Sequence, residues 1–476
     1  MTSPIDLSTL IGYQGFRELL FIGGSSDVVY SLDSDLGKPY FKTKFDSMEK
    51  VASTNSTVLC PGGLTANVAM PGGSAPRRFG GFGGGASRGP RGPAVFWAVS
   101  SDGYLRTLRQ QDGDAKYIAP MKFVPANANL TGINVNDDIL YVSTVNGCGG
   151  NPNGLYAGIY TPPQIPPSPG EPVLSPPSFK VTSLLTNGSG FSGSGGTAIG
   201  ATTGIVYGQV AEGHGDVAGT YNDTVLAMDP KTLEVKDYFT PSDTLPALKK
   251  NVESPGVTPV VFDWNKKDVL VAGGRDGRLY LLDSASLGGA DHHTPLYKTE
   301  PIVVPDAQFG GNGIWGTFAT WVDVAHDNTR WLYAAIRGSA ALKTGEMNGS
   351  ASTGAIVAFK VEDQGGKPTL TQQWVSSDMI SPAAPVIANG LVFALSTGES
   401  PRVAKKDGTP YTVAETVKMS KNAVLHILDG ATGKELYSSG NAATSFAHSG
   451  LAVANGRVYF STHDNTLFVY GVPEER

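Results

Sequence analysis

The sequence predicts an all-β fold, an eight-bladed β-propeller of four-stranded antiparallel blades, and two observations lead to it. Apolar runs of four to seven residues recur along the 476-residue chain, bounded by Asp-Gly, Asn-Gly or Gly-Gly pairs. Such runs are typical of strands that end in tight hairpins. A strand rich in small residues precedes each group of runs, at intervals of 56 to 67 residues. Four strands per period, repeated radially, are the pattern of a propeller.

The blades can be assigned in order from these leading strands, which begin near Ser8, Leu64, Leu130, Gly196, Gly256, Gly316, Ala383 and Gly450. Ala, Gly and Thr dominate the leading strands, because inner strands of a radial array crowd together near the axis. The strands that follow are clearest in 19–41, 95–118, 269–289 and 458–471. A seven-bladed ring, in which the first and last periods share one blade, is the alternative.

The chain ends and two insertions complete the predicted architecture, a single domain of residues 1–476. The last period, 450–471, supplies three strands, so we expect residues 1–7 to pair with its open edge and close the ring. A Gly/Arg-rich insertion spans 71–93 and a proline-rich one spans 161–178. We expect both to lie outside the sheets, the second as polyproline II.

Composition excludes several classes of protein. With 40% hydrophobic residues, 61 Gly and 32 Pro and no glycine at every third position, the chain is neither disordered nor collagen-like. A net charge of −6 without a basic stripe argues against nucleic acid as a partner. No apolar stretch approaches 18 residues, so no membrane span is predicted. Few charges and only 2 Cys favour an exported protein, periplasmic or secreted, and a closed ring favours a monomer.

The two cysteines stand at corresponding places in neighbouring periods. Cys60 and Cys148 each precede glycine at the start of a segment on the channel side. One disulfide joining the second blade to the third would suit this placement, and two buried free thiols are the alternative.

The segment 423–471 resembles the repeat of pyrroloquinoline-quinone-type propellers, found in quinoprotein alcohol dehydrogenases. Its signature, LDxxTGKxLW, is matched by Asp429, Thr432, Gly433 and Lys434, with Tyr437 where tryptophan is usual. Weaker copies at 32–40 and 282–283 extend the resemblance along the chain. The resemblance implies a propeller fold, and the family contains both dehydrogenases and non-enzymatic scaffolds.

For the dehydrogenases, the resemblance implies pyrroloquinoline quinone with calcium as cofactors and a separate electron-acceptor protein as partner. This chain lacks two of their features. Its cysteines are 88 residues apart, so the disulfide between adjacent cysteines is absent, and no Cys-x-x-Cys-His sequence is present to attach haem. Soluble quinoprotein sugar dehydrogenases manage without either feature.

Candidate site residues follow from the propeller geometry, because turns that lead into the inner strands surround the axial channel. Those turns carry Glu253, Asn312, Trp315, Asp378 and His448. Glu253, Asp378 and Asn312 suit a calcium ion, and Glu253, Asn312 and Trp315 suit a cofactor with a flat ring. His448 and Asp378 are the candidate catalytic residues, with His448 as base. In the structural alternative, Trp315 fills the channel and His448 makes a structural hydrogen bond.

These residues favour an oxidoreductase acting on an alcohol or a sugar-like substrate in the axial funnel. A non-catalytic propeller that binds carbohydrate or protein is the rival hypothesis. A lyase or isomerase that uses the funnel residues as acid and base is a third.

Overall fold

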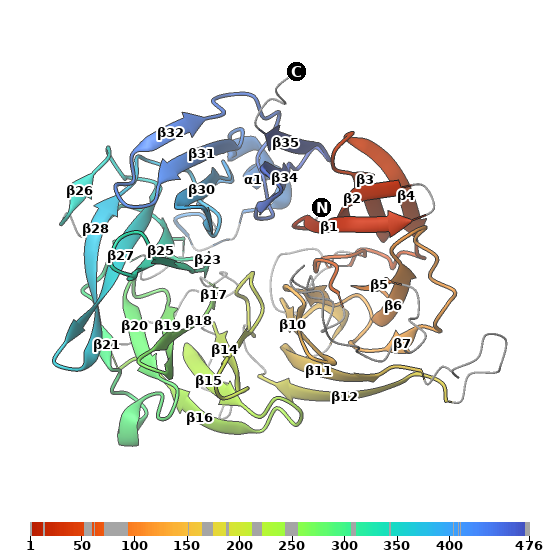
Figure 1. The fold of residues 1–476 in the computed structure, drawn as a ribbon, viewed down its shortest axis with the longest axis horizontal. Coiled ribbons are helices and arrows are strands. Elements are labelled where there is room, and N and C mark those ends of the chain that lie inside the picture. Colours follow the sequence, from red (N-terminus) through yellow and green to blue (C-terminus); the bar gives the residue numbers. More distant parts are fainter. Residues whose placement is uncertain are drawn as a thin grey trace, which may run out of the picture.

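Apolar runs and tight turns produce antiparallel sheets, which the computed structural model arranges as blades around a central axis (Figure 1). The blades follow one another in chain order, so the N-terminal blade lies beside the C-terminal one (Figure 1). The structure describes residues 2–12, 15–51, 60, 62–70, 94–150, 152–163, 175–186, 190–211, 221–242, 256–305, 311–341, 344–402, 404–407, 409 and 411–471. The predicted insertion 71–93 lies outside these residues.

The first four blades occupy the N-terminal half of the chain. Blade 1 contains β1 (Ile5–Gly12), β2 (Gly15–Gly24), β3 (Val28–Asp33) and β4 (Lys38–Lys44). Blade 2 contains β5 (Val95–Val99), β6 (Tyr104–Arg109) and β7 (Met121–Lys122). Blade 3 contains β8 (Asn129–Leu130), β9 (Asn134–Asn136), β10 (Ile139–Val145), β11 (Gly154–Thr161) and β12 (Ser178–Leu185). Blade 4 contains β13 (Ala198–Ile199), β14 (Val206–Val210), β15 (Thr224–Met228) and β16 (Val235–Phe239).

The other four blades complete the ring. Blade 5 contains β18 (Val260–Trp264), β19 (Lys267–Gly273), β20 (Leu279–Asp283) and β21 (Tyr297–Lys298). Blade 6 contains β22 (Gly313–Ile314), β24 (Ala319–Asp323), β25 (Thr329–Arg337), β26 (Glu346–Met347), β27 (Gly354–Gln364) and β28 (Lys367–Val375). Blade 7 contains β29 (Val386–Ala388), β30 (Leu391–Ser396), β31 (Val424–Asp429) and β32 (Glu435–Ser438). Blade 8 contains β33 (Ala452–Ala454), β34 (Arg457–Ser461) and β35 (Leu467–Gly471).

The eight-bladed prediction is confirmed, and the seven-bladed alternative is wrong. Each period forms its own sheet, and the first and last periods form separate sheets. Blades 1, 4, 5 and 7 have the predicted four strands in sequence order. In blade 2 the inner strand is reduced, among the described residues, to a single bridge between Ala69 and Trp97.

The predicted closure through residues 1–7 is wrong. Ile5, Asp6 and Leu7 pair with β2 of their own blade, in register with Phe21, Leu20 and Leu19. Polar contacts join blade 8 to blade 1 instead. Asn455 Nδ2 donates to Asp6 Oδ2 at 2.9 Å, and Arg457 Nη1 lies 2.9 Å from Asp35 Oδ1 and 3.6 Å from Glu18 Oε2. We call this blade 8 to blade 1 junction the seam.

The hydrophobic core is divided among the spaces between consecutive blades. Seven clusters of buried side chains fill the seven junctions from blade 1–blade 2 to blade 7–blade 8. Phe21 packs on Phe96 across the first junction, with ring centroids 4.5 Å apart. Among the described side chains, which exclude those of 7–16, no such cluster spans the seam. Burial therefore holds each blade mainly to its sequence neighbours.

Connections between strands carry two features that bear on the sequence predictions. The proline-rich insertion joins β11 to β12, which pair up to Thr161 and Ser178, and its residues 164–174 lie outside the described part of the chain. A longer connection, 397–423, joins β30 to β31 and contains the helix α1 (Val413–Met419), which the sequence analysis did not predict. Thr412 and Glu415 form a capping box at its start. None of the helices described could cross a membrane, given their length and hydropathy.

The motif that resembles the quinoprotein repeat has a structural role. Asp429 Oδ1 accepts hydrogen bonds from the N–H groups of Ala431 and Thr432, which shapes the turn after β31. Gly433 has φ of +72°, and a Cβ there would lie 2.4 Å from the Trp374 ring of blade 6. Trp374 Nε1 donates to the Gly430 carbonyl at 3.0 Å. The motif thus docks one blade on the preceding one, so it carries information about fold rather than chemistry.

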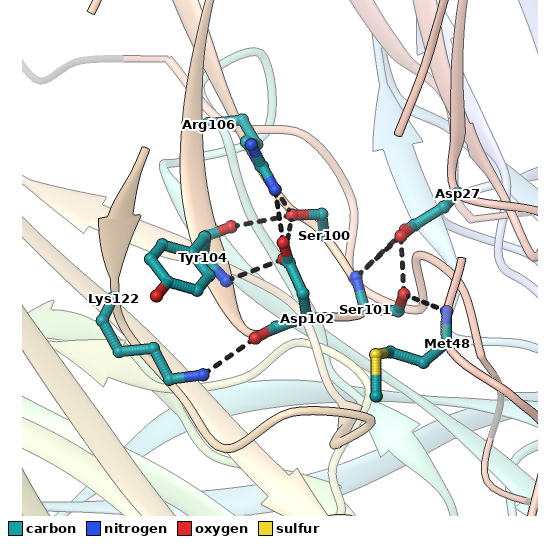
Figure 2. Close-up of polar contacts among 8 residues, drawn as sticks. All are labelled: Asp27, Met48, Ser100, Ser101, Asp102, Tyr104, Arg106 and Lys122. Carbon is teal, nitrogen blue, oxygen red and sulfur yellow. Dashed lines mark hydrogen bonds and ion pairs between the residues drawn. The ribbon is translucent and has the colours of Figure 1, made fainter. Parts of the chain in front are cut away.

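A polar network joins the turns of blades 1 and 2 (Figure 2). Asp27 is fully buried, and both its carboxylate oxygens accept from the Ser101 N–H, at 3.1 and 3.0 Å. The Ser101 hydroxyl donates to Asp27 Oδ2 at 2.6 Å and accepts from the Met48 N–H at 2.9 Å. Beside it, Asp102 pairs with Arg106 (Figure 2).

Replacing Asp27 by asparagine should change how stability depends on pH. Burial raises the pKa of Asp27 from its usual value of 3.8, although the hydrogen bonds from Ser101 act in the opposite direction. Because the folded-state pKa is the higher one, the contribution of Asp27 to stability is greatest at low pH and is lost as the pH rises through the folded-state pKa. We expect Asp27→Asn to lack this component and to lie within about 1 kcal/mol of the wild type at neutral pH.

Guanidinium unfolding at a series of pH values from about 4 to 7 measures the effect. Asp102→Asn is the control, because it removes the ion pair with Arg106 from the same network and leaves Asp27 in place. Parallel pH profiles for the wild type and Asp27→Asn would contradict the prediction.

Candidate functional site

A cavity of about 520 Å³ lies where the blades meet, and every blade contributes to its wall. The wall is formed mainly by the segments that lead into the first strand of each blade, as the sequence analysis expected. The lining residues are Thr2, Ser3, Leu64, Thr65, Asn67, Asn129, Leu130, Thr131, Gly132, Ser192, Ser194, Gly195, Gly256, Trp315, Gly316, Thr317, Arg337, Pro382, Ala383, Ala384, Pro385, Val386, Thr397, His448, Ser449, Gly450 and Leu451. Hydroxyl and amide groups are frequent among them.

Small residues allow the inner segments to approach closely around this cavity. A Cβ on Gly256 would lie 2.4 Å from Ser192 Oγ. Two short inner strands, β17 (Val257–Thr258) and β23 (Gly316–Thr317), form a parallel pair between blades 5 and 6. Gly316 has φ of +87°, a conformation that favours glycine. The predicted reason for the small residues, crowding near the axis, is thus seen in the contacts.

An indole and a guanidinium stack on the blade 6 side of the cavity. Arg337, the last residue of β25, places Cζ 4.2 Å from the centroid of the Trp315 ring. Trp315 Nε1 is buried and has no hydrogen-bond partner among the described residues. Trp315 therefore lies in the cavity wall as predicted, with the Arg337 guanidinium over its ring.

A histidine and a glutamate pair on the blade 7 and blade 8 side. His448 precedes β33, and its Nδ1 lies 3.1 Å from Glu399 Oε1. The imidazole side chain is 77% exposed and the glutamate side chain only 19%. Glu399 comes from the 397–423 connection, close behind the cavity residue Thr397. Sequence reasoning placed His448 at the cavity and missed Glu399 and Arg337.

Electrostatics keep the Glu399 carboxylate ionised. Burial alone would raise its pKa, but His448, Arg337 and His463 together lower the pKa below the usual value of 4.5. His463 stands on the turn between β34 and β35, with its ring stacked on Phe446 at 4.6 Å. A negative charge is therefore held beside His448 and is surrounded by groups that are, or can become, cationic.

Asn312 and Asp378 are not among the described residues that line the cavity. Asn312 Nδ2 donates to the Val304 carbonyl at 3.1 Å. Asp378 accepts from the N–H groups of Ser352 and Thr353, both at 2.7 Å. Burial would raise the pKa of Asp378, but these hydrogen bonds lower it overall. Glu253 lies outside the described residues.

The predicted calcium site is not seen among the described residues. Nowhere in the described ranges do three His, Cys, Asp or Glu side chains gather in a way that could hold a metal ion. The Asp378 carboxylate accepts hydrogen bonds from the backbone of Ser352 and Thr353, and the Arg337 guanidinium lies over the Trp315 ring. Because Glu253 is not described, its part in a metal or cofactor site stays a prediction.

Cys60 and Cys148 form the predicted disulfide, with their Cα atoms 5.4 Å apart. It joins the segment before blade 2 to the turn between β10 and β11 of blade 3. Asn127 reinforces the same region, because its Oδ1 accepts from the Gly62 N–H at 2.9 Å and its Nδ2 donates to the Glu49 carbonyl at 2.8 Å. Gly62 leads to Leu64 and Thr65 of the cavity wall, so the disulfide anchors one side of the cavity.

Comparison with known proteins shows the fold and nothing finer. No family model matches the sequence, and neither does any curated protein. Similar solved structures include a europium-containing methanol dehydrogenase, with a TM-score of 0.52 and 12% identity over 95% of this chain and 80% of that chain. Sqt1 from Saccharomyces cerevisiae has a TM-score of 0.50 and 11% identity, and the alignment covers 96% of this chain and 93% of that chain. The alignment with BamB from Moraxella catarrhalis covers 100% of this chain and 99% of that chain at 12% identity, with a TM-score of only 0.35. The chain is an eight-bladed β-propeller, similar in fold to propellers that include an enzyme.

Proposed function

We propose that the axial cavity binds a small hydroxylated molecule, an alcohol or a sugar-like substrate, and that His448 exchanges a proton with one of its hydroxyl groups. The observation that carries the proposal is the joint presence, in one cavity of about 520 Å³, of hydroxyl and amide groups, the Trp315 indole and the exposed His448 imidazole. Concave sites with a few polar groups are the usual place for small ligands. Imidazole exchanges protons near neutral pH.

More specifically, we propose that the protein oxidises the hydroxyl group of the bound molecule. The sequence resemblance to quinoprotein alcohol dehydrogenases and the fold likeness to a methanol dehydrogenase support it. Oxidation also needs an acceptor for two electrons, which pyrroloquinoline quinone supplies in that family. The described residues contribute a proton acceptor, His448, and a cation, Arg337, but no calcium ligand set.

Binding and turnover are tested separately. Calorimetric titration with ethanol, glycerol, glucose and maltose is expected to show saturable binding of at least one of them, because the cavity offers hydroxyl and amide partners. Dye reduction is then measured with the bound compound, with and without added pyrroloquinoline quinone and calcium. Reduction that needs the quinone supports the oxidoreductase.

The remaining outcomes separate the other hypotheses. Binding without reduction, but with chemical conversion of the compound, points to the lyase or isomerase. Binding without any conversion points to a non-catalytic carbohydrate-binding propeller. Absence of binding to all four compounds overturns the proposed function.

We also propose that the protein works in an oxidising compartment outside the cytoplasm. The disulfide between Cys60 and Cys148 supports this location, since such bonds persist where thiols are not kept reduced. The low content of charged residues, 16%, is consistent with it.

A further inference from the structure

The contact between Glu399 and His448 differs from another histidine–carboxylate pair of equal exposure, which lies on blade 6. His326 pairs with Asp323 at 2.7 Å, three residues away, and is also 77% exposed. That pair caps the turn between β24 and β25 and does not line the cavity. Glu399 reaches His448 across 49 residues, from another blade, and His448 forms part of the cavity wall. Glu399 of blade 7 therefore holds the His448 side chain, which belongs to the segment before blade 8, in place at the cavity wall.

Charge around Glu399 determines which proton arrangement the pair adopts. The carboxylate contacts His448, from the segment before β33, at 3.1 Å, and the charges of Arg337, at the end of β25, and His463, on the turn between β34 and β35, also act on it. Ionised, it can only accept hydrogen bonds, so the neutral imidazole must present its proton at Nδ1. The lone pair of that imidazole then resides on Nε2, the nitrogen on the far side of the ring from Glu399.

We propose that Glu399 is the positioning residue for His448, holding the imidazole in the Nδ1–H tautomer so that Nε2 can take the proton of a hydroxyl group bound in the cavity. This inference rests on the proposed function. In the step, the substrate O–H bond breaks, an Nε2–H bond forms, and the electron pair stays on the substrate oxygen. The imidazolium that results is stabilised by Glu399, and the proton returns to the same oxygen or passes to water.

The tautomer can be measured without a substrate. Nitrogen-15 chemical shifts of the imidazole rings distinguish Nδ1–H from Nε2–H, and the signals of His448 are identified by their loss in His448→Ala. We expect the wild type to show the Nδ1–H tautomer at a pH where the ring is neutral. An Nε2–H tautomer in the wild type overturns the proposal, and this measurement depends on no variant of Glu399.

Glu399→Gln tests the role of the charge. Glutamine removes the charge, and its –NH2 can donate to Nδ1 of the imidazole as readily as its oxygen can accept from it. We expect the fraction of the Nδ1–H tautomer to fall in this variant and that of Nε2–H to rise. Asp323→Asn is the matched control, because it changes the partner of an equally exposed histidine and should leave the His448 signals unchanged.

Turnover provides the second readout once a converted compound is known. Glu399→Gln is expected to lower kcat by about 100-fold with little change in KM, and Asp323→Asn to change neither. A switched tautomer with unchanged kcat overturns the positioning role and leaves the proposed function standing. If no compound binds or reacts, the proposed function fails, and the positioning role fails with it even where the tautomer is as expected.

Discussion

Replacing His448 by alanine is expected to lower kcat by about 10²–10⁴-fold while the affinity for the bound compound changes only a few-fold. The reason is that, in the proposed function, the imidazole acts on the proton, whereas the hydroxyl, amide and indole groups of the cavity wall would contact the ligand. Steady-state kinetics on the compound identified by titration, combined with calorimetry on the variant, measures the two quantities.

His326→Ala is the matched control for this experiment. His326 is as exposed as His448, and its imidazole also pairs with a carboxylate, but it lies away from the cavity. We expect it to keep full turnover. If His448→Ala loses affinity and turnover together, or loses neither, His448 is a structural residue of the cavity wall and not its base.

Removing the disulfide through the double substitution of Cys60 and Cys148 by serine is expected to lower the free energy of unfolding by about 2–5 kcal/mol. The bond closes a stretch of 88 residues, and in the chain-entropy description a loop of that length contributes about 4–5 kcal/mol by restricting the unfolded chain. Guanidinium unfolding of the wild type and of the double variant measures the difference.

The reducing agent supplies the control for the disulfide. Wild type unfolded in dithiothreitol should match the double variant, and the variant should be indifferent to the reagent. Equal unfolding midpoints with and without dithiothreitol would falsify the prediction. Mass spectrometry after thiol labelling checks independently that the untreated protein carries no reactive cysteine.

The sequence was sufficient to predict the blades because each strand and turn has a local signature. Short apolar runs and glycine-containing turns recur eight times, and the crowding at the axis leaves its own mark in residues such as Gly256 and Gly316. The pairing of Cys60 with Cys148 followed from their matching positions in adjacent periods. These features depend on short stretches of chain and on regular repetition.

The prediction of ring closure failed because it gave the exposed edge of β35 more weight than local chain connectivity. β1 and β2 are joined through a tight connection between Gly12 and Gly15, so their pairing orders a short loop, whereas pairing β1 with β35 would close nearly the entire chain. The repeat pattern alone could not distinguish the two pairings, because it predicts the same strands whether β1 pairs with β2 or with β35.

The site was predicted in part, and the omissions have a geometric cause. Trp315 and His448 were placed correctly at the cavity because they immediately precede inner strands. Arg337 was missed because it ends a second strand, although in an antiparallel blade the end of the second strand lies at the same edge as the start of the first. Glu399 belongs to an irregular connection, where no periodic signal exists. Attention to second-strand ends would have found Arg337 and Thr397.

The seam differs from the other junctions of the ring in the contacts that hold its two blades together. Among the described side chains, a buried apolar cluster fills every other junction, whereas the seam holds two ion pairs, an amide hydrogen bond and the buried Tyr459. Thr2 and Ser3 line the cavity on one side of this junction, and His448 and Ser449 line it on the other. The polar contacts that join the two ends of the ring therefore also bring the Thr2 side and the His448 side of the cavity wall together.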